Sequence, residues 1–460
     1  MDATLRSHIA QLESLAVSQG LDYYSIDFET VPDSFMMEIA VYGLPIRMPH
    51  WSFGVRYIYQ LVQHRMGNSR LFEVVFPGNP NRAYLASRNS VEENTLVAAH
   101  VIGHSDFAKN NSLFRNCQNQ LGFRIVEQAA AHARSISDAI DTHGEARVEA
   151  VLDAALALEQ HIDVHKGLTR PLYEADKVIS AAPVDSEFAN RLAKLDVGRD
   201  PCPDKIQDVK STTPPAPERD LLWFIARYGS ELEDWERDIL LAVREESFYF
   251  YPVFACQIMN EGWACFWHAR LLREASFLPP SVYLDAIKSH SDVVRPYAGE
   301  SRVSASINPY YLGFKLWEHI IDNNDLEFAR EVMTQDDDFS FVRNYLNEDI
   351  AEKLELFNYE VKSNGQVNVV DRDIDKLREN LLRPKYNFSA PLIEVRSLDV
   401  DGTLNLAHDF SRDGRGLDLA RAEKVLAYVQ KIWRRPITMS STDAEGKEQT
   451  IEYPGGRQIH

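Results

Sequence analysis

Two histidines with helical spacing, His100 and His104 in the segment HVIGH, are the first candidates for chemistry in this sequence. On an α-helix, residues four apart project from the same face, one turn above each other. Two imidazole nitrogens placed this way can bind one divalent cation, and neutral imidazole suits zinc with bonds of roughly 2.0–2.1 Å. The spacing therefore predicts a metal site, with a pair of buried core histidines as the alternative.

A second pair, His161 and His165, has the same spacing and encloses Asp163. If it faces the first pair, enough ligands exist for a two-metal site or for an octahedral iron or manganese centre. Two such pairs are only a mild excess over chance in a chain with 14 histidines. Spacing alone is therefore weak support for a metal site.

A carboxylate that would complete the site lies far downstream, in the segment QIMNEGWACFWH. Its Glu261, Cys265 and His268 form one stripe of a helix at i, i+4 and i+7. A carboxylate on a helix this rich in aromatic residues is costly to bury unless it meets a cation or hydrogen-bond donors. We therefore expect Glu261 to join His100 and His104, with His268 as a neighbour and further candidate ligand. A Glu bonded to a buried Arg or Tyr is the alternative.

The elements that must position these residues are mostly helices. Ser90 and Glu93 form an S-x-x-E capping box, which predicts a helix running through the first histidine pair. Before it, the β-branched and aromatic segments 71–76 and 82–85 flank a Pro-Gly-Asn-Pro turn and predict a hairpin. Residues 21–54, with three prolines, are expected to be irregular. Further helices are expected at 1–20, 56–66, 113–142, 145–165, 169–180, 221–278, 309–333 and 339–360.

The C-terminal part has a different pattern, with short strand-like segments at 367–370, 392–395, 403–407, 437–439 and 450–452 and a helix at 417–434. This pattern predicts a small α+β domain beside a mainly α body. A Pro-rich polar stretch reads as a connector. The expected organisation is 1–183, the first part of the helical core; 184–219, the connector; 220–365, the second part of the core; and 366–460, the α+β domain.

The composition narrows the function classes. The 49 basic and 69 acidic side chains give a formal charge of −20, which disfavours nucleic acid and anionic membranes as partners. The four cysteines are scattered, which fits a reducing compartment. No apolar run approaches the roughly 18 residues of a membrane span. The N-terminus lacks the pattern of a signal peptide, so a cytoplasmic location is expected.

The two metal-site motifs together resemble the gluzincin metallopeptidases, in which one helix supplies H-E-x-x-H and a later helix supplies a glutamate within N-E-G-[FW]-A. The resemblance implies a zincin-like helical core with the hairpin as the edge strand of the cleft. In gluzincins the residue after the first histidine is the general base, but here it is Val101, which cannot accept a proton. This departure predicts either that another carboxylate serves as the base or that the site has a different role.

A longer resemblance is to the SpoVR family, named for stage V sporulation protein R. It rests on PHWSFG (49–54), AHVIGHSDFAKNN (99–111), EQHIDVH (159–165), LLWFIARYGSELEDWERDIL (221–240), REESFYFYPVFACQIMNEGWACFWH (244–268) and INPYYLGFKLWEHI (307–320). The resemblance implies a cytoplasmic protein linked to spore cortex formation or, in other bacteria, to a stress operon with a serine kinase and a von Willebrand-type protein. It implies no established reaction.

These observations lead to a first hypothesis, a metal-dependent hydrolase of peptide or peptidoglycan-related amides. Glu245 or Glu246 would then replace the missing base, because both lie upstream of Glu261 in the same helical region; a solvated helix face is the alternative for both. A second hypothesis is a regulatory or scaffold protein with a degenerate site, which the residue Val101 favours. An oxygen-using iron protein is a third. Zinc is the expected metal, with iron or manganese as alternatives.

Overall fold

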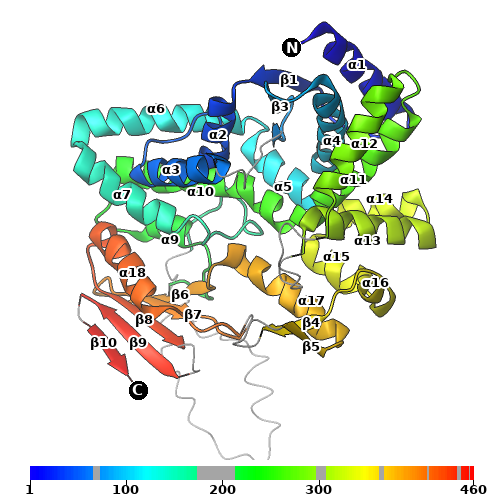
Figure 1. Ribbon diagram of the computed structural model, residues 1–460. Coiled ribbons are helices and arrows are strands. Elements are labelled where there is room, and N and C mark those ends of the chain that lie inside the picture. The colour runs from blue at the N-terminus through cyan, green and yellow to red at the C-terminus, as the bar shows by residue number, and fades with distance from the viewer. Residues whose placement is uncertain are drawn as a thin grey trace, which may run out of the picture.

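Helices dominate the structure, a computed structural model that describes residues 1–65, 73–173, 213–296, 307–361, 367–411, 414–442, 447–454 and 456–459 (Figure 1). Small sheets occur at the two ends of the chain. The predicted mainly α class is therefore confirmed. Within the described ranges, no helix is both long and apolar enough to cross a bilayer. Most of the expected connector, residues 184–212, lies outside the described residues.

The first part of the chain combines a small sheet with seven helices. Its elements are α1 (Ala3–Ser18), β1 (Ile26–Val31), α2 (Asp33–Tyr42), α3 (Trp51–Arg65), β2 (Glu73–Phe76), β3 (Asn81–Ala86), α4 (Val91–Asn110), α5 (Ser112–Leu121), α6 (Ile125–His143) and α7 (Glu145–Ala157). The sheet has the order β1-β3-β2, with β1 parallel and β2 antiparallel to β3. The hairpin expected from the sequence is thus confirmed.

The prediction of irregular structure at 21–54 was wrong, because the segment contains β1, α2 and the start of α3. Pro32 does not interrupt a helix but occupies the position just before α2, where a missing N–H costs nothing. The strand β1 pairs with β3, more than 50 residues downstream. Local sequence patterns do not reveal such a distant partner.

In the central part, the regular elements of the described ranges are all helices. It contains α9 (Leu221–Tyr228), α10 (Asp234–Ala255), α11 (Gln257–Glu274), α12 (Pro280–Val293), α13 (Pro309–Asn323), α14 (Leu326–Gln335), α15 (Asp338–Tyr345) and α16 (Glu348–Lys353). The chain continues through Pro252 inside α10 and breaks at Cys256, between α10 and α11.

The C-terminal part contains the larger sheet. Its elements are β4 (Asn358–Val361), β5 (Val367–Asp371), α17 (Ile374–Leu382), the irregular segment η2 (Arg383–Ser389), β6 (Ile393–Leu398), β7 (Leu404–His408), α18 (Leu419–Trp433), β8 (Ile437–Thr442), β9 (Glu448–Tyr453) and β10 (Gly456–Ile459). Five strands have the order β10-β9-β8-β7-β6, and β4 pairs with β5. The expected α and β elements of this region are all present.

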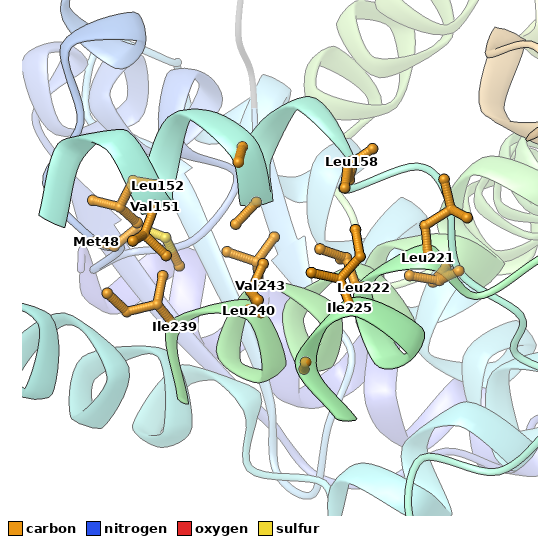
Figure 2. Close-up of a cluster of buried hydrophobic side chains, with 14 of the residues drawn as sticks. Met48, Val151, Leu152, Leu158, Leu221, Leu222, Ile225, Ile239, Leu240 and Val243 are labelled. Atoms are coloured by element: carbon orange, nitrogen blue, oxygen red, sulfur yellow. The ribbon is translucent and has the colours of Figure 1, made fainter. Parts of the chain in front are cut away.

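Two large hydrophobic clusters form the core. The first joins α7, α9 and α10 to the C-terminal sheet and α18. Figure 2 shows part of it, where Val151 and Leu152 of α7 face Ile239 and Leu240 of α10. The second cluster surrounds α4 and α11 with α1, α12 and α13 to α17. The helices α4 and α11 are thus buried on most of their surface, and they carry the candidate site.

Candidate metal centre

The helix α4 positions the first histidine pair. The capping box of Ser90 and Glu93 is present, so the helix begins where the sequence predicted. The rings of His100 and His104 project from one face, with centroids 4.5 Å apart and planes at 86°. His100 is buried, whereas the His104 side chain keeps 12% of its surface exposed. The pair therefore lies at the boundary between core and solvent.

Small residues let α11 approach α4 and α13 closely. A Cβ on Gly103 of α4 would lie 2.7 Å from the Cα of Ala264 on α11. A Cβ on Gly262 would lie 2.2 Å from the backbone of Gly313 on α13. Both distances are below any real Cβ contact, so these backbones meet without room for side chains. Glu261, next to Gly262, is thereby held against both histidines.

The nearest atoms of the three side chains suit a single cation. Glu261 Oε2 lies 3.5 Å from His100 Nε2 and 3.3 Å from His104 Nε2. Ligands bonded to one tetrahedral zinc ion at roughly 2.0–2.1 Å are separated by about 3.3 Å. His100 Nε2 and Glu261 Oε2 are buried without a hydrogen-bond partner, which is costly unless something else fills the space between them. These three donor atoms therefore fit a divalent ion.

The other ring nitrogens hold both imidazoles in the orientation that a metal requires. His104 Nδ1 lies 2.8 Å from Asn260 Oδ1, and an amide oxygen only accepts, so His104 Nδ1 donates. His100 Nδ1 lies 2.9 Å from His268 Nδ1. Metal-binding histidines commonly use the second nitrogen in this way, which fixes the tautomer and directs the first nitrogen to the ion. Asn260 was not singled out from the sequence.

Burial and charge act in opposite directions within this cluster. Burial favours the neutral acid at Glu261, but the neighbouring imidazoles outweigh it and lower its pKa to about 2. Burial also opposes a charge on His104, yet the carboxylate of Glu261 outweighs burial and raises the pKa of His104. Burial and the neighbouring His104 lower the pKa of His100 to about 4. Glu261 is therefore a carboxylate at neutral pH, ready to bind a cation.

Two residues missed by the sequence reasoning lie beside the cluster. Glu73 begins β2, the edge strand of the small sheet, and burial with the nearby charge of Glu261 raises its pKa to about 7, although His104 acts against this. Tyr310, at the start of α13, stacks on His100 with centroids 6.1 Å apart. The charge of Glu261, burial and a hydrogen bond to Glu261 raise the pKa of Tyr310. No spacing rule links these residues to the histidine pair.

The comparison with known proteins agrees with the longer of the two resemblances, the one to the SpoVR family. A family model described as "SpoVR like protein" matches residues 2–390. The chain belongs to the SpoVR-like family. The SpoVR-like chain is also 28% identical to the "Uncharacterized protein YcgB" of Escherichia coli (strain K12), over 97% of this chain and 93% of that protein. No solved structure matches.

The two glutamates proposed as general bases have other partners in the SpoVR-like chain. Glu245 Oε2 lies 2.9 Å from His132 Nε2 on α6. Glu246 is fully buried, and Arg47 donates to it at 2.6 Å. The alternative interpretation, a solvated helix face, is therefore wrong for Glu246. Both glutamates lie on α10, which is a separate helix from α11 because the chain breaks at Cys256. Their partners are His132 on α6 and Arg47, which precedes α3.

The second histidine pair is not on a helix. The helix expected over 145–165 was too long, because α7 ends at Ala157. The Asp163 side chain accepts a hydrogen bond from the backbone N–H of His165, a local turn that competes with helix formation. His161 is buried, which lowers its pKa to about 4, and His165 is exposed. Neither belongs to a group of potential metal ligands among the described residues.

His268 lies next to the cluster but contacts His100 rather than Glu261. Its ring is fully buried, and burial with the neighbouring histidines lowers its pKa well below the usual range. His100, Cys265 and His268 form a second group close enough for a metal. However, the 2.9 Å between His100 Nδ1 and His268 Nδ1 is a hydrogen-bond distance. It is shorter than the separation of two ligands on one zinc ion.

Proposed function

We propose that this SpoVR-like protein binds one divalent cation, zinc before iron or manganese, through His100 Nε2, His104 Nε2 and Glu261 Oε2. The observation that carries the proposal is the convergence of these three atoms, 3.3 and 3.5 Å apart, with two of them buried and unpartnered. Three protein ligands leave a fourth position open, which is the pattern of catalytic rather than structural zinc sites. The partial exposure of His104 and Glu261 gives a substrate access.

We further propose that the site hydrolyses an amide bond of a peptide or a peptidoglycan-related peptide. A bound divalent ion supplies Lewis acidity, which polarises a carbonyl and makes water more acidic. Glu73 takes the place of the missing base at Val101, because a carboxyl with a pKa of about 7 can accept a proton from water near neutral pH. Tyr310 contributes an O–H at the same cluster. This O–H donates a hydrogen bond to the substrate carbonyl oxygen as that oxygen gains negative charge.

The arrangement also supports a zincin-like core made by α4, α11 and β2. The edge strand β2 carries Glu73 and pairs with β3 on one side only, within the described sheet. An extended peptide could add to the other side, as peptides do at sheet edges. A cytoplasmic location is proposed from the composition together with the family resemblance. A link to spore cortex formation or stress response, and the serine kinase and von Willebrand-type partners, are proposed from the family resemblance alone.

A second candidate function is a regulatory or scaffold protein with a degenerate zincin site. The observation that favours it is Val101, which is fully buried and stands where the resembling peptidases have their base. Such a protein would retain the cation and a partner-binding role, but it would not hydrolyse amides. A measurement of metal binding together with amide hydrolysis therefore separates the two functions.

The test is metal content and affinity of the purified full-length protein. We expect about one zinc per wild-type chain and loss of most binding in Glu261→Ala. Glu245→Gln is the matched control, because Glu245 also pairs with a histidine but outside the cluster. Metal-loaded protein is then incubated with amide, peptide and stem-peptide substrates, and products are read by mass spectrometry.

Metal content that stays unchanged in Glu261→Ala would overturn the site. Hydrolysis that disappears in Glu73→Gln while zinc is retained would support the enzyme. Zinc binding without hydrolysis of any of these substrates, together with kinase binding that survives Glu73→Gln, would favour the scaffold.

A further inference from the structure

Three histidine rings from three helices form a hydrogen-bonded row that leads away from the candidate metal centre. His100 Nδ1 on α4 lies 2.9 Å from His268 Nδ1 on α11. His268 Nε2 lies 2.5 Å from His290 Nδ1 on α12. The first two rings are buried, and His290 is partly exposed. The row therefore connects the centre to the surface through α12, which packs on both α4 and α11.

The direction of hydrogen bonds along this row is restricted. Each neutral imidazole carries one hydrogen, so it donates through one nitrogen and accepts through the other. If His100 donates from Nδ1, His268 accepts at Nδ1 and must donate from Nε2 to His290 Nδ1. If the row runs in the opposite direction, His100 accepts at Nδ1 and carries its hydrogen on Nε2. Only the first arrangement leaves His100 Nε2 free to bind a cation.

We propose that His268 and His290 are positioning residues that hold His100 in its Nδ1–H tautomer and so prepare Nε2 for the metal. This inference rests on the proposed metal site. His268 is the direct acceptor, and His290 acts through it by accepting the hydrogen of His268 Nε2. In most metal-binding histidines, a carboxylate or a backbone carbonyl accepts the hydrogen of the second ring nitrogen. In this protein the row of His268 and His290 has that role.

The geometry favours this role over a second metal ion at His100, Cys265 and His268. Both nitrogens of His268 already have partners at hydrogen-bond distance, His100 and His290. A metal bound to His268 would have to displace one of these bonds.

The position of His290 links the centre to α12. Because α12 supplies the last acceptor of the row, undocking α12 removes the group that orients His268. The Nδ1–H tautomer of His100 is then no longer stabilised by a hydrogen bond to His268. Metal affinity and the docking of α12 should therefore rise and fall together.

The test compares zinc affinity, measured by competition with a chelator, in wild type, His290→Leu and His290→Asn. The Leu variant removes the acceptor, whereas the Asn side chain offers an amide oxygen close to the place of Nδ1. We expect affinity to fall roughly 10- to 100-fold in His290→Leu, as for other outer partners of metal-binding histidines, and to recover largely in His290→Asn. His319→Leu is the matched control, because His319 is a partly exposed histidine bonded to Asn347 outside the row.

A readout that needs no variant is the tautomer itself. In histidine-labelled zinc-free protein, where no metal fixes the tautomer, long-range 1H–15N correlations should assign the hydrogen of His100 to Nδ1 and that of His268 to Nε2. The opposite assignment would overturn the inference, even if a variant failed to fold.

The outcomes separate this inference from the proposed site. Wild-type affinity in His290→Leu, with binding still lost in Glu261→Ala, would refute the role of the row and leave the site intact. Unchanged binding in Glu261→Ala would refute the site itself. Two zinc ions per wild-type chain, falling to one in Cys265→Ala, would make His268 a ligand and would also refute the row.

Discussion

The close contact between α11 and α13 gives a quantitative prediction about how the candidate centre is assembled. In Gly262→Ala, the new Cβ would lie 2.2 Å from the carbonyl carbon of Gly313. An ordinary contact needs at least 3.4 Å, so the two backbones must separate by roughly 1.2 Å. Overpacking a core costs about 1–3 kcal/mol when side chains can adjust. Here only backbone can move, so we expect a loss of at least about 3 kcal/mol.

Two further glycines provide a graded series. In Gly103→Ala the new Cβ would lie 2.7 Å from the Cα of Ala264, so the required shift is smaller and the expected cost is about 1–3 kcal/mol. Gly54, in α3, has nothing within 4 Å of the position where its Cβ would lie. Gly54→Ala should therefore stabilise the protein by roughly 0.5–1 kcal/mol, the usual gain from replacing a helical glycine.

The assay is the unfolding midpoint in denaturant for the three variants, followed by zinc affinity of those that fold. The expected order of stability is Gly54→Ala, wild type, Gly103→Ala and then Gly262→Ala. Zinc affinity should fall in Gly262→Ala because the shift moves the neighbouring Glu261 relative to α4. If Gly262→Ala is as stable as wild type, the close contact between α11 and α13 does not exist as described. That contact then does not position Glu261.

Two predictions concern pH. In the metal-loaded protein, amide hydrolysis should fall as pH decreases through an ionisation at or below about 7, because Glu73 must be a carboxylate to act as base and a bound cation favours that form. A pH–rate profile tests this, with Glu29→Gln, exposed on β1, as control; an unchanged profile in Glu73→Gln would exclude the role. For His132, Glu245 and Glu246 overcome burial and raise the pKa from 6.5 to about 9. Because this pKa is raised on folding, protonated His132 stabilises the folded state fully below pH 6.5, and this stabilisation is lost as the pH rises through about 9. At about 1.4 kcal/mol per pH unit, the free energy of unfolding falls by at most about 3 kcal/mol. Denaturant midpoints of wild type should fall over this range and those of His132→Gln should not; parallel curves would contradict the assignment.

The sequence was sufficient to predict those features that depend on residues close together in the chain. The capping box at Ser90 and the i, i+4 spacing of His100 and His104 depend only on helix geometry, and both appear as expected. The hairpin before α4 and the short strands of the C-terminal sheet were also predicted, because alternating β-branched residues and turn residues lie close together in the chain. The pairing of Glu261 with the histidines was reached by adding family resemblance to the cost of burying a carboxylate.

Local patterns failed where a residue's role depends on a distant partner. Glu245 and Glu246 are close to Glu261 in sequence, yet the break at Cys256 separates their helices, and they pair with His132 and Arg47. For the pair His161 and His165, the turn made by Asp163 replaces the helix that the spacing assumed.

The sequence by itself determined that this protein carries two helices, each with part of the candidate site. Only the tertiary structure decided which atoms meet, because glycine and alanine contacts between α11 and its neighbours set the helix separation. It also placed Glu73 and Tyr310 beside this centre and His290 at the outer end of the histidine row, from three elements remote in sequence. Helix periodicity places a side chain on a face, but only packing between helices determines what that face meets.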